Sequence, residues 1–446
     1  MARDWKSLGG DRGRKVETGR LGRALKLGGL ATKVSGSFLK RQIKRIGGQS
    51  DDLEGMAGAA LDNARQIVEV MGEMKGAAMK VGQLLSTDPD ILDPEFAQRL
   101  KTLQNSAPPM DFETLSAQVE AALDQPIEAV FKFFDPEPIG SASIGQVHRA
   151  QLFDGREVAV KIQYPGIAGS IESDVRNLGS LLKLGRVFIS KERADQFVEE
   201  ARDAILAEAD YTQEARNLER FRAHFKDFEG VRIPEPVLAY TRPNLLVMEF
   251  IEGQPFDVGV NALPDPHLRN ELADRFLRVF VYMFHDLHEL HADPHPGNFL
   301  LDQDQNIVLL DFGCIRTFDP FYSDGVLRIL RAFWDDDMVE LSRIYRELKF
   351  GTETMTYPSH DVLRAYHNLI LAPMKHHGPF RFADFKVHSE ARAFVRKHMS
   401  ILKLVPPREL LLYLRVVAGM KGMMTRIDAE VHVREGAEEV CERRGI

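Results

Sequence analysis

The chain has 446 residues, enough for about three domains of ordinary size or for fewer large ones. Its 44% hydrophobic and 28% charged residues are close to the averages of soluble proteins, which excludes disordered and collagen-like chains. The two cysteines, Cys314 and Cys441, can supply neither a disulfide framework nor a cysteine zinc site, and they fit a reducing compartment. The net charge of −8 is unevenly distributed along the chain.

Residues 1–50 form a basic segment. They contain 13 Lys or Arg and three acidic residues, a net charge of +10 that leaves −18 for the remainder. Such a segment can bind an anionic surface, either lipid or nucleic acid, by neutralising its charge. A solvated, partly helical tail explains the same composition at least as well, because glycines interrupt the roughly helical spacing of the apolar residues.

The sequence contains no evident membrane span, since no stretch reaches the roughly 18 uninterrupted apolar residues that a span needs. The nearest candidate, 410–427, is interrupted by Arg415, Lys421 and Arg426. A core helix is therefore the preferred interpretation of this segment, and a membrane-facing helix is the second choice. The first residues also lack the compact apolar region of a secretory signal. We therefore expect a cytoplasmic protein whose membrane contact, where it occurs, is peripheral and made through residues 1–50.

The first half of the chain changes from helical to strand patterning. In chain order, the patterns predict helices over 53–86, 94–104 and 111–133, then strands over 146–153 and 156–164. The pair Asp154-Gly155 separates the two strands, and such a pair is a strong local signal for a hairpin. Residues 171–228 then return to helical, charge-rich patterning.

The second half of the chain is mainly helical. In chain order, the patterns predict strands over 237–240 and 245–251, a helix over about 270–291, a loop over 293–298, and a hairpin formed by 299–301 and 307–310. Beyond about residue 320 the chain is predominantly helical in pattern.

Two features of the strand region suggest phosphate binding. Lys161 ends the run Val-Ala-Val-Lys on a strand of small apolar residues, where it can reach a phosphate. Upstream, the small residues of 140–145, including Ser141, Ala142 and Ser143, allow backbone N–H groups to approach a phosphate. Each feature alone also fits a simpler interpretation, a strand lysine that faces water and an ordinary tight turn.

A more specific pattern lies in the loop after the predicted 270–291 helix. Asp293 and Asn298 are five residues apart, and Asp311-Phe312-Gly313 follows one hairpin later. Two carboxylates and a carboxamide supply the hard oxygen ligands that Mg²⁺ prefers, and Mg²⁺ neutralises nucleotide phosphates. The spacing matches the H-R-D-x-x-x-x-N and D-F-G elements of protein kinases, with His291-Ala292-Asp293 in place of H-R-D.

These residues identify a family resemblance. From about residue 55 to at least 330, the chain resembles the UbiB family, the AarF-domain-containing atypical kinases. The K-x-G-Q motif of that family is present as Lys80-Val81-Gly82-Gln83, and its E-x-D motif as Glu208-Ala209-Asp210. Its nucleotide loop, rich in alanine or serine instead of glycine, is similar to Ser141-Ala142-Ser143.

The resemblance implies an α+β, protein-kinase-like fold of two lobes that binds ATP and Mg²⁺. The implied organisation is a basic segment over 1–50, a helical extension with K-x-G-Q over 51–110, an N-lobe with a helical insertion over 111–252, and a helical C-lobe over 253–446. An insertion is expected because 53 positions separate Lys161 from Glu214, a longer connection than ordinary kinases use.

The resemblance also implies roles for individual residues. Lys161 would contact the α- and β-phosphates and pair with a carboxylate, for which Glu214 is the first choice and Glu208 the second. Glu214 is preferred because Asp210 and Glu214, one helical turn apart, would share a face that Glu208 would not. Asp293 would position or deprotonate a nucleophile.

Further roles concern the metal, the adenine and the acceptor site. Asn298 and Asp311 would hold Mg²⁺, and Met248-Glu249 would form the hinge that meets adenine. In the family, the K-x-G-Q helix packs over the place where a protein substrate would sit. Lys80 would then act beside the catalytic residues and pair with Glu208 or Asp210, and Gln83 would belong to the same nucleotide site.

The implied function is that of an ATP- and Mg²⁺-dependent atypical kinase or ATPase that supports ubiquinone or other isoprenoid-lipid metabolism. The A-P-E element of peptide kinases is absent after Asp-Phe-Gly, so we expect a small or lipid-like acceptor, or water, in place of a protein. Nucleic acid is not an expected partner. The alternative is a nucleotide-binding pseudokinase that acts as a regulatory scaffold, because such a protein would keep every binding residue.

Two other groups of residues carry less specific signals. Four histidines lie before and in the loop: His285, His288, His291 and His295. The first three recur at three-residue steps. This spacing suggests a zinc site, but buried or cleft-lining histidines on one helix explain it better. Cys314, directly after Gly313, is expected to be buried and unreactive.

Overall fold

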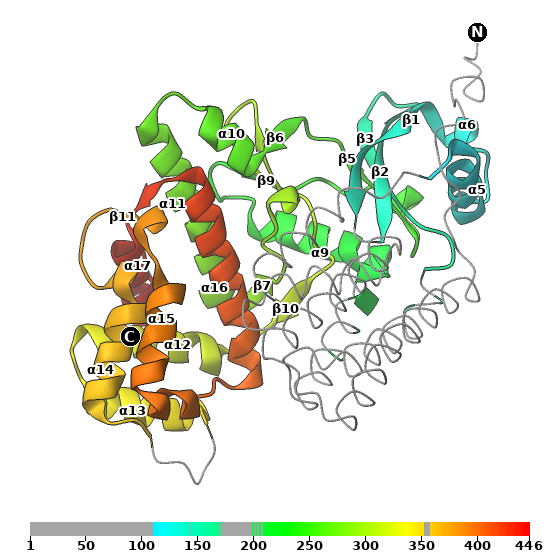
Figure 1. Ribbon diagram of the computed structural model, residues 1–446. Helices are drawn as coiled ribbons and strands as arrows, with labels where there is room; N and C mark the ends of the chain where they lie inside the picture. Colours follow the sequence, from blue (N-terminus) through cyan, green and yellow to red (C-terminus); the bar gives the residue numbers. More distant parts are fainter. Residues whose placement is uncertain are drawn as a thin grey trace, which may run out of the picture. The chain divides into compact units, whose positions relative to one another are not determined.

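The computed structural model describes residues 110–446, except 143, 168, 170, 172–198, 200–201, 203–204, 207 and 352–356 (Figure 1). The predicted helices over 53–86 and 94–104, the K-x-G-Q motif and the basic segment lie outside the described residues, as does most of the expected helical insertion. The described chain divides into two compact units. The first contains 110–223 and 234–250, and the second contains 224–233 and 251–446.

The first unit is built on an antiparallel four-stranded sheet of order β1-β2-β3-β5. Its strands are β1 (Phe131–Ala142), β2 (Gly145–Leu152), β3 (Glu157–Gln163) and β5 (Leu245–Glu249). Its helices are α5 (Phe112–Leu123), α6 (Ile127–Val130), α9 (Tyr211–His224, whose last residue falls in the second unit) and the 3₁₀ turn η2 (Leu238–Tyr240). In Figure 1, α6 lies beside β1 at the edge of this sheet.

Turn chemistry accounts for the hairpin of β2 and β3. Gly155 has φ 93°, in the left-handed region that glycine adopts without strain, and the strands pair from Gly145 with Gln163 to Gln151 with Glu157. The hairpin predicted at Asp154-Gly155 is therefore confirmed.

Two predictions for the first unit are wrong in part. The helix expected over 111–133 ends at Leu123, because Asp124 adopts a left-handed conformation (φ 56°). Pro126 then precedes the single turn of α6, which ends where Phe131 is extended and β1 begins. The strand expected over 237–240 is a 3₁₀ turn. There the Thr241 hydroxyl donates to the Val237 carbonyl (3.1 Å), which holds the backbone in a turn.

The second unit contains a four-stranded sheet of order β4-β9-β8-β6 and two strand pairs, β7 with β10 and β11 with β12. The sheet strands are β4 (Val231–Arg232), β6 (Gly253–Pro255), β8 (Phe299–Asp302) and β9 (Ile307–Leu309). The pairs are β7 (Glu289–His291) with β10 (Ile315–Thr317), and β11 (Phe380–Arg381) with β12 (Glu430–Val431). The predicted hairpin after the 293–298 loop is confirmed as β8 and β9.

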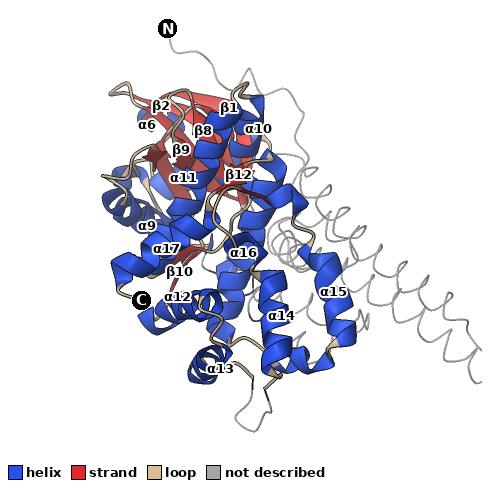
Figure 2. Cartoon of the chain, turned by 90° about the vertical axis from the view of Figure 1, so that its left-hand side faces the viewer, coloured by secondary structure: helices blue, strands red, loops and turns tan. Residues whose placement is uncertain are grey.

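Helices make up most of the second unit, as expected (Figure 2). The α-helices are α10 (Phe256–Ala262), α11 (Pro266–His285), α12 (Pro320–Trp334), α13 (Met338–Glu347), α14 (His360–Ile370), α15 (Val387–Lys397), α16 (Arg408–Ile427) and α17 (Val433–Arg444). The 3₁₀ turns are η3 (Pro296–Asn298), η4 (Ala372–Met374), η5 (Phe382–Asp384) and η6 (Met399–Lys403).

The helix predicted over 270–291 ends early, at His285. His288 has φ 53°, which a continuing α-helix does not allow, and His291 already belongs to strand β7. The expected placement of three histidines on one helix is therefore wrong. Among the described residues, no group of three or more His, Cys, Asp or Glu side chains is arranged to hold a metal ion by itself.

Stacked aromatic rings form part of the core of the second unit. The rings of Phe256 and Phe276 stack at 4.9 Å, and Phe299 meets Phe276 edge to face at 5.0 Å. All three side chains are fully buried, so the core fixes α10 and α11 against β8, the strand that follows the 293–298 loop. Within the part of the chain that the structure describes, no helix has the length and apolar character needed to cross a bilayer.

Candidate functional site

A buried ion pair connects β3 and α9 in the first unit. Lys161 Nζ lies 2.8 and 2.9 Å from the two carboxylate oxygens of Glu214. The Lys161 side chain is 8% exposed and that of Glu214 is 1% exposed, so both charges are almost completely removed from water. The Tyr211 ring lies 5.0 Å from the same ammonium. The pair agrees with the first choice of partner made from the sequence.

The start of α9 explains why Glu214 points to the lysine. Asp210 lies just before the helix, where its Oδ1 accepts hydrogen bonds from the Thr212 N–H (2.9 Å) and hydroxyl (2.6 Å). Asp210 is therefore an exposed capping residue, whereas Glu214 faces inward from the first turn. The shared helical face expected for these two residues does not form. Glu208 is buried as well, at 8% exposure.

Gln163 holds the Glu208–Asp210 segment against the sheet, a role that the sequence analysis missed. Its Nε2 donates to the Ala209 carbonyl (2.7 Å) and to the Pro243 carbonyl (3.2 Å). Gln163 is two residues after Lys161 and 4% exposed. A buried amide needs partners, so a glutamine at a core position of a predicted strand is the signal that could have suggested this role.

The small-residue loop is the turn between β1 and β2. Ser141 pairs with Gln146 and Ala142 with Gly145, while Ser143 and the K-x-G-Q residues Lys80 and Gln83 lie outside the described residues. A Cβ atom at Gly145 would lie 2.2 Å from the Ile162 carbonyl oxygen, so only glycine permits this approach of β2 to β3.

Met248 and Glu249 end β5, opposite Ala159 and Val158 of β3. Met248 is 6% exposed, and the Glu249 N–H donates to the Glu235 carbonyl (2.8 Å). The end of β5 is thus held by hydrogen bonds on the side away from β3 as well.

In the second unit, a buried imidazole links the Asp293 loop to Asp311. His291 is fully buried; its Nδ1 accepts from the Asp293 N–H (3.3 Å), and its Nε2 donates to the Asp311 carbonyl. The tautomer with hydrogen on Nε2 satisfies both contacts. The sequence placed His291 in the H-R-D-like motif, but the only role predicted for it was that of a buried or cleft-lining histidine.

The Asp293 loop is closed by its own hydrogen bonds. Asn298 Nδ2 donates to the Asp293 carbonyl (2.9 Å), and the Leu310 N–H, one residue before Asp311, donates to the Asn298 carbonyl (3.0 Å). With Nδ2 directed at the loop, Oδ1 of Asn298 is the amide atom available to a cation. Asp311 Oδ1 accepts from the Gly313 N–H (2.9 Å).

Residues around this loop are closely packed. Phe312 is fully buried and meets the His291 ring edge to face at 5.8 Å, and Cys314 is buried, as expected. On the other side, α16 contacts the loop, because a Cβ atom at Gly419 would lie 2.4 Å from Pro294 Cγ. The oxygen donors of Asn298 and Asp311 are of the type that fits Mg²⁺, which keeps water and phosphate oxygens among its ligands.

Comparisons with known proteins agree with these motifs. The ABC1 atypical kinase-like domain matches residues 102–345. The chain is 29% identical over 433 residues to the mitochondrial atypical kinase coq-8 of Caenorhabditis elegans, covering 93% of this chain and 56% of that protein. It is 29% identical over 438 residues to the mitochondrial atypical kinase COQ8B of Rattus norvegicus, covering 97% and 82%. A probable serine/threonine-protein kinase of Dictyostelium discoideum, abkA, is 33% identical over 361 residues, covering 76% of this chain and 63% of that protein.

A solved structure is similar over most of the chain. The complex of Rv3197 from Mycobacterium tuberculosis with erythromycin matches with a TM-score of 0.61 at 25% identity, covering 87% of this chain and 97% of that one. The predicted α+β, kinase-like fold class is confirmed. The chain spans a little over half the length of the C. elegans relative. Since the domain match covers more than half of the 446 residues, the chain belongs to the ABC1 (UbiB) family of atypical kinase-like proteins.

Proposed function

We propose that the protein is an ATP- and Mg²⁺-dependent atypical kinase or ATPase that supports ubiquinone or other isoprenoid-lipid metabolism. The observation that carries the proposal is the buried Lys161–Glu214 ion pair. Burying two charges is costly and adds little to stability compared with an apolar pair of similar size, so the pair calls for a functional reason. Holding an ammonium in place for nucleotide phosphates is such a reason.

In this proposal the first unit recognises the nucleotide. Lys161, oriented by Glu214, contacts the α- and β-phosphates. Backbone N–H groups of Ser141–Ser143 approach the phosphates, and the end of β5 at Met248-Glu249 meets the adenine. Glu208 and Asp210 remain proposed partners of Lys80, and Gln83 a proposed member of the same site.

The second unit supplies the groups that act on the γ-phosphate. Asn298 and Asp311 would hold Mg²⁺, which neutralises charge on the phosphates when bound. Asp293 accepts the proton of the attacking hydroxyl or water, which makes that oxygen a better nucleophile. The hydrogen bonds of His291 support this proposal, because its ring binds the backbone at both Asp293 and Asp311.

The acceptor is proposed to be a small or lipid-like molecule, or water. The lack of an A-P-E element after Asp-Phe-Gly supports this choice, since that element is associated with binding of peptide substrates. The link to ubiquinone and isoprenoid lipids rests on the family to which the chain belongs.

The test is Mg²⁺-dependent ATP binding and hydrolysis by the purified full chain. Asp311→Asn should abolish both Mg²⁺-dependent binding and turnover, and Asp293→Asn should keep binding but lose turnover. Asp361→Asn is the matched control, because that carboxylate side chain is 95% exposed at the start of α14. The proposal fails if the unaltered chain binds no Mg²⁺-ATP, or if its turnover equals that of Asp311→Asn. Normal cellular function in an Asp293→Asn protein would instead support a regulatory pseudokinase.

We also propose that residues 1–50 make peripheral contact with anionic membrane, on the basis of their net charge of +10. Replacing the 13 Lys and Arg of this segment by Gln in the full chain should reduce its binding to anionic vesicles. Unchanged binding at every salt concentration would remove this role.

A further inference from the structure

One region of the second unit combines positive charge with exposed apolar side chains. Residues 391–427, which include most of α15, all of η6 and all of α16, contain eight Lys or Arg and one acidic residue. Their net charge of +7 contrasts with −8 for the whole chain. Large single-sign regions of this kind are usually related to binding of the opposite charge.

The apolar part of this region is unusual for a protein surface. Of the 14 large hydrophobic side chains that are exposed among the described residues, six lie between positions 399 and 417. They are exposed by 40–62%: Met399, Leu402, Val405, Leu411, Leu414 and Val417. We call these six side chains the η6–α16 surface. Apolar side chains concentrated in this way mark an interaction site more often than single exposed ones do.

Helix α16 carries apolar side chains on two sides. Val416, Met423 and Met424 are buried and form its inner side. Leu411 and Leu414, together with the exposed Ala418, recur at steps of three and four residues, so they lie along one outer face. An ordinary surface helix exposes mainly charged or polar residues, whereas α16 exposes these large apolar side chains together with Arg408, Thr425 and Arg426.

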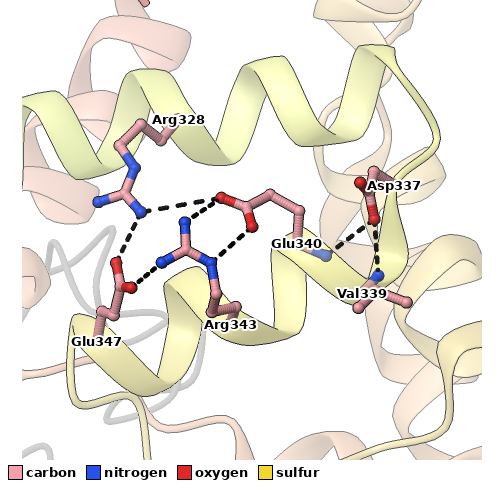
Figure 3. Close-up of polar contacts among 6 residues, drawn as sticks. All are labelled: Arg328, Asp337, Val339, Glu340, Arg343 and Glu347. Atoms are coloured by element: carbon pink, nitrogen blue, oxygen red, sulfur yellow. Dashed lines mark hydrogen bonds and ion pairs between the residues drawn. The ribbon is translucent and has the colours of Figure 1, made fainter.

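Five cations around this surface lack acidic partners in the described part of the chain. Arg392, Arg396, Lys397, Lys403 and Arg408 are all exposed, and none forms an ion pair with a carboxylate in the described part of the chain. Neighbouring helices differ. In Figure 3, Arg343 of α13 contacts both Glu340 and Glu347, and Arg328 of α12 also bonds Glu347 (2.6 Å). The charges of Arg328 and Arg343 are thus neutralised within the protein, whereas those of the five cations are left for an external anion.

We propose that the η6–α16 surface docks onto an anionic phospholipid membrane. The six apolar side chains enter the boundary between headgroups and acyl chains, and the five cations contact lipid phosphates. Helices that bind membrane interfaces typically place apolar and cationic side chains in this way. Charge complementarity favours an anionic membrane as the binding partner of this surface, and not a second copy of the chain. A symmetric contact between two copies would bring the same unpaired cations face to face.

Docking in this way has a consequence for the Asp293 loop. Gly419 of α16 contacts Pro294, so the helix that carries the outer apolar face also packs directly against the loop. A helix is about 10 Å across, so the loop lies roughly one helix diameter from the docked surface. A lipid-dissolved acceptor would thereby be close to Asp293. The docking itself does not depend on the proposed ATP chemistry, because it requires no nucleotide.

The direct test is an environment-sensitive fluorophore at the surface. Leu402→Cys in the full chain is labelled with a nitrobenzoxadiazole maleimide, and Val339→Cys, at a position of 69% exposure on α13, is the matched control. Both native cysteines are buried and should not react. Vesicles of equal parts phosphatidylcholine and phosphatidylglycerol should raise the emission at position 402 by about threefold and shift it to the blue, with no change at 339. Phosphatidylcholine alone should have little effect.

A reporter on the surface is needed because residues 1–50 could hold the chain on vesicles by themselves. In the labelled Leu402→Cys background, Leu411→Asp with Leu414→Asp should remove the blue shift. Lys397→Glu with Lys403→Glu should lower the affinity for anionic vesicles by about 30-fold or more, since each cation near the membrane contributes about 1 kcal/mol. Val339→Asp should leave both unchanged. The proposal is overturned if the label at 402 does not respond to anionic vesicles, or if it responds equally in the Asp double variant. A blue shift that appears without lipid and rises with protein concentration would mean that a second copy covers the surface, and it would also overturn the proposal.

Discussion

The Lys161–Glu214 ion pair allows a quantitative test of the structure. In Glu214→Gln the ammonium of Lys161 keeps its position at 8% side-chain exposure but loses the carboxylate whose two oxygens lie 2.8 and 2.9 Å away. Removing one member of a buried pair leaves an uncompensated charge and costs about 3–5 kcal/mol. We expect the substitution to destabilise the first unit by that amount.

The measurement is hydrogen exchange of peptides from β3 and α9, because it reports the first unit separately from the second. A loss of about 3 kcal/mol corresponds to exchange that is roughly 10²-fold faster in both elements. Lys161→Met and the double variant Lys161→Met with Glu214→Leu complete a thermodynamic cycle. The double variant should be much less destabilised than the sum of the single ones, since an apolar pair carries no desolvation cost.

The result that would refute the reasoning is a small effect. If Glu214→Gln accelerates exchange by less than about fivefold, the loss is below about 1 kcal/mol, the range of solvent-exposed pairs. Additive single and double variants would mean that Lys161 and Glu214 act independently. In either case the pair would no longer support the proposed nucleotide role.

The other predictions concern the second unit. His291→Phe keeps a buried ring but removes both hydrogen bonds, so ATP turnover should fall by about 10²-fold while ATP affinity changes by only a fewfold, as measured by steady-state kinetics and titration. Gly419→Ala should lower the melting temperature because its Cβ would overlap Pro294, whereas Gly422→Ala, with open space around it on the same helix, should be neutral or stabilising by up to about 1 kcal/mol. Burial lowers the pKa of His285 from 6.5 to about 4. The unfolded state therefore binds more protons between these values, and stability should fall by about 2 kcal/mol from pH 7 to pH 5, a dependence that His285→Leu should reduce in urea titrations.

Local turn chemistry explains which parts of the fold could be predicted. Asp154-Gly155 specifies its hairpin through residues within the turn, since Gly155 takes the left-handed conformation and Asp154 Oδ1 accepts from the Arg156 N–H (3.0 Å). The next predicted hairpin is similar, because Asp302 accepts from the Asn306 N–H (2.8 Å) and so closes its own turn. Both were found correctly because the residues that decide them are adjacent in sequence.

The failures have the opposite cause. Apolar spacing continued the predicted helix to His291, but His288 lies in the left-handed region, and its ring contacts Ser323 Oγ (3.0 Å), 35 residues later in the chain. The pairing of β7 with β10 also joins residues that are distant in sequence, such as His291 and Ile315. Helical periodicity within the segment could not reveal either contact.

In the candidate site, the sequence likewise predicts the motif residues but not the contacts that His291 makes with them. Motif spacing identified Asp293 and Asp311 as a pair, yet it contained no information on what holds them in register. That function falls to His291, whose two ring nitrogens must act in opposite senses, one as acceptor and one as donor. An asparagine or glutamine offers both functions, but without the ring that packs against Phe299 and Phe312 in a fully buried position. Position 291 therefore requires both a buried ring and two hydrogen-bonding nitrogens. An interpretation of His291 as a core residue, based on burial alone, misses the hydrogen bonds that connect Asp293 and Asp311.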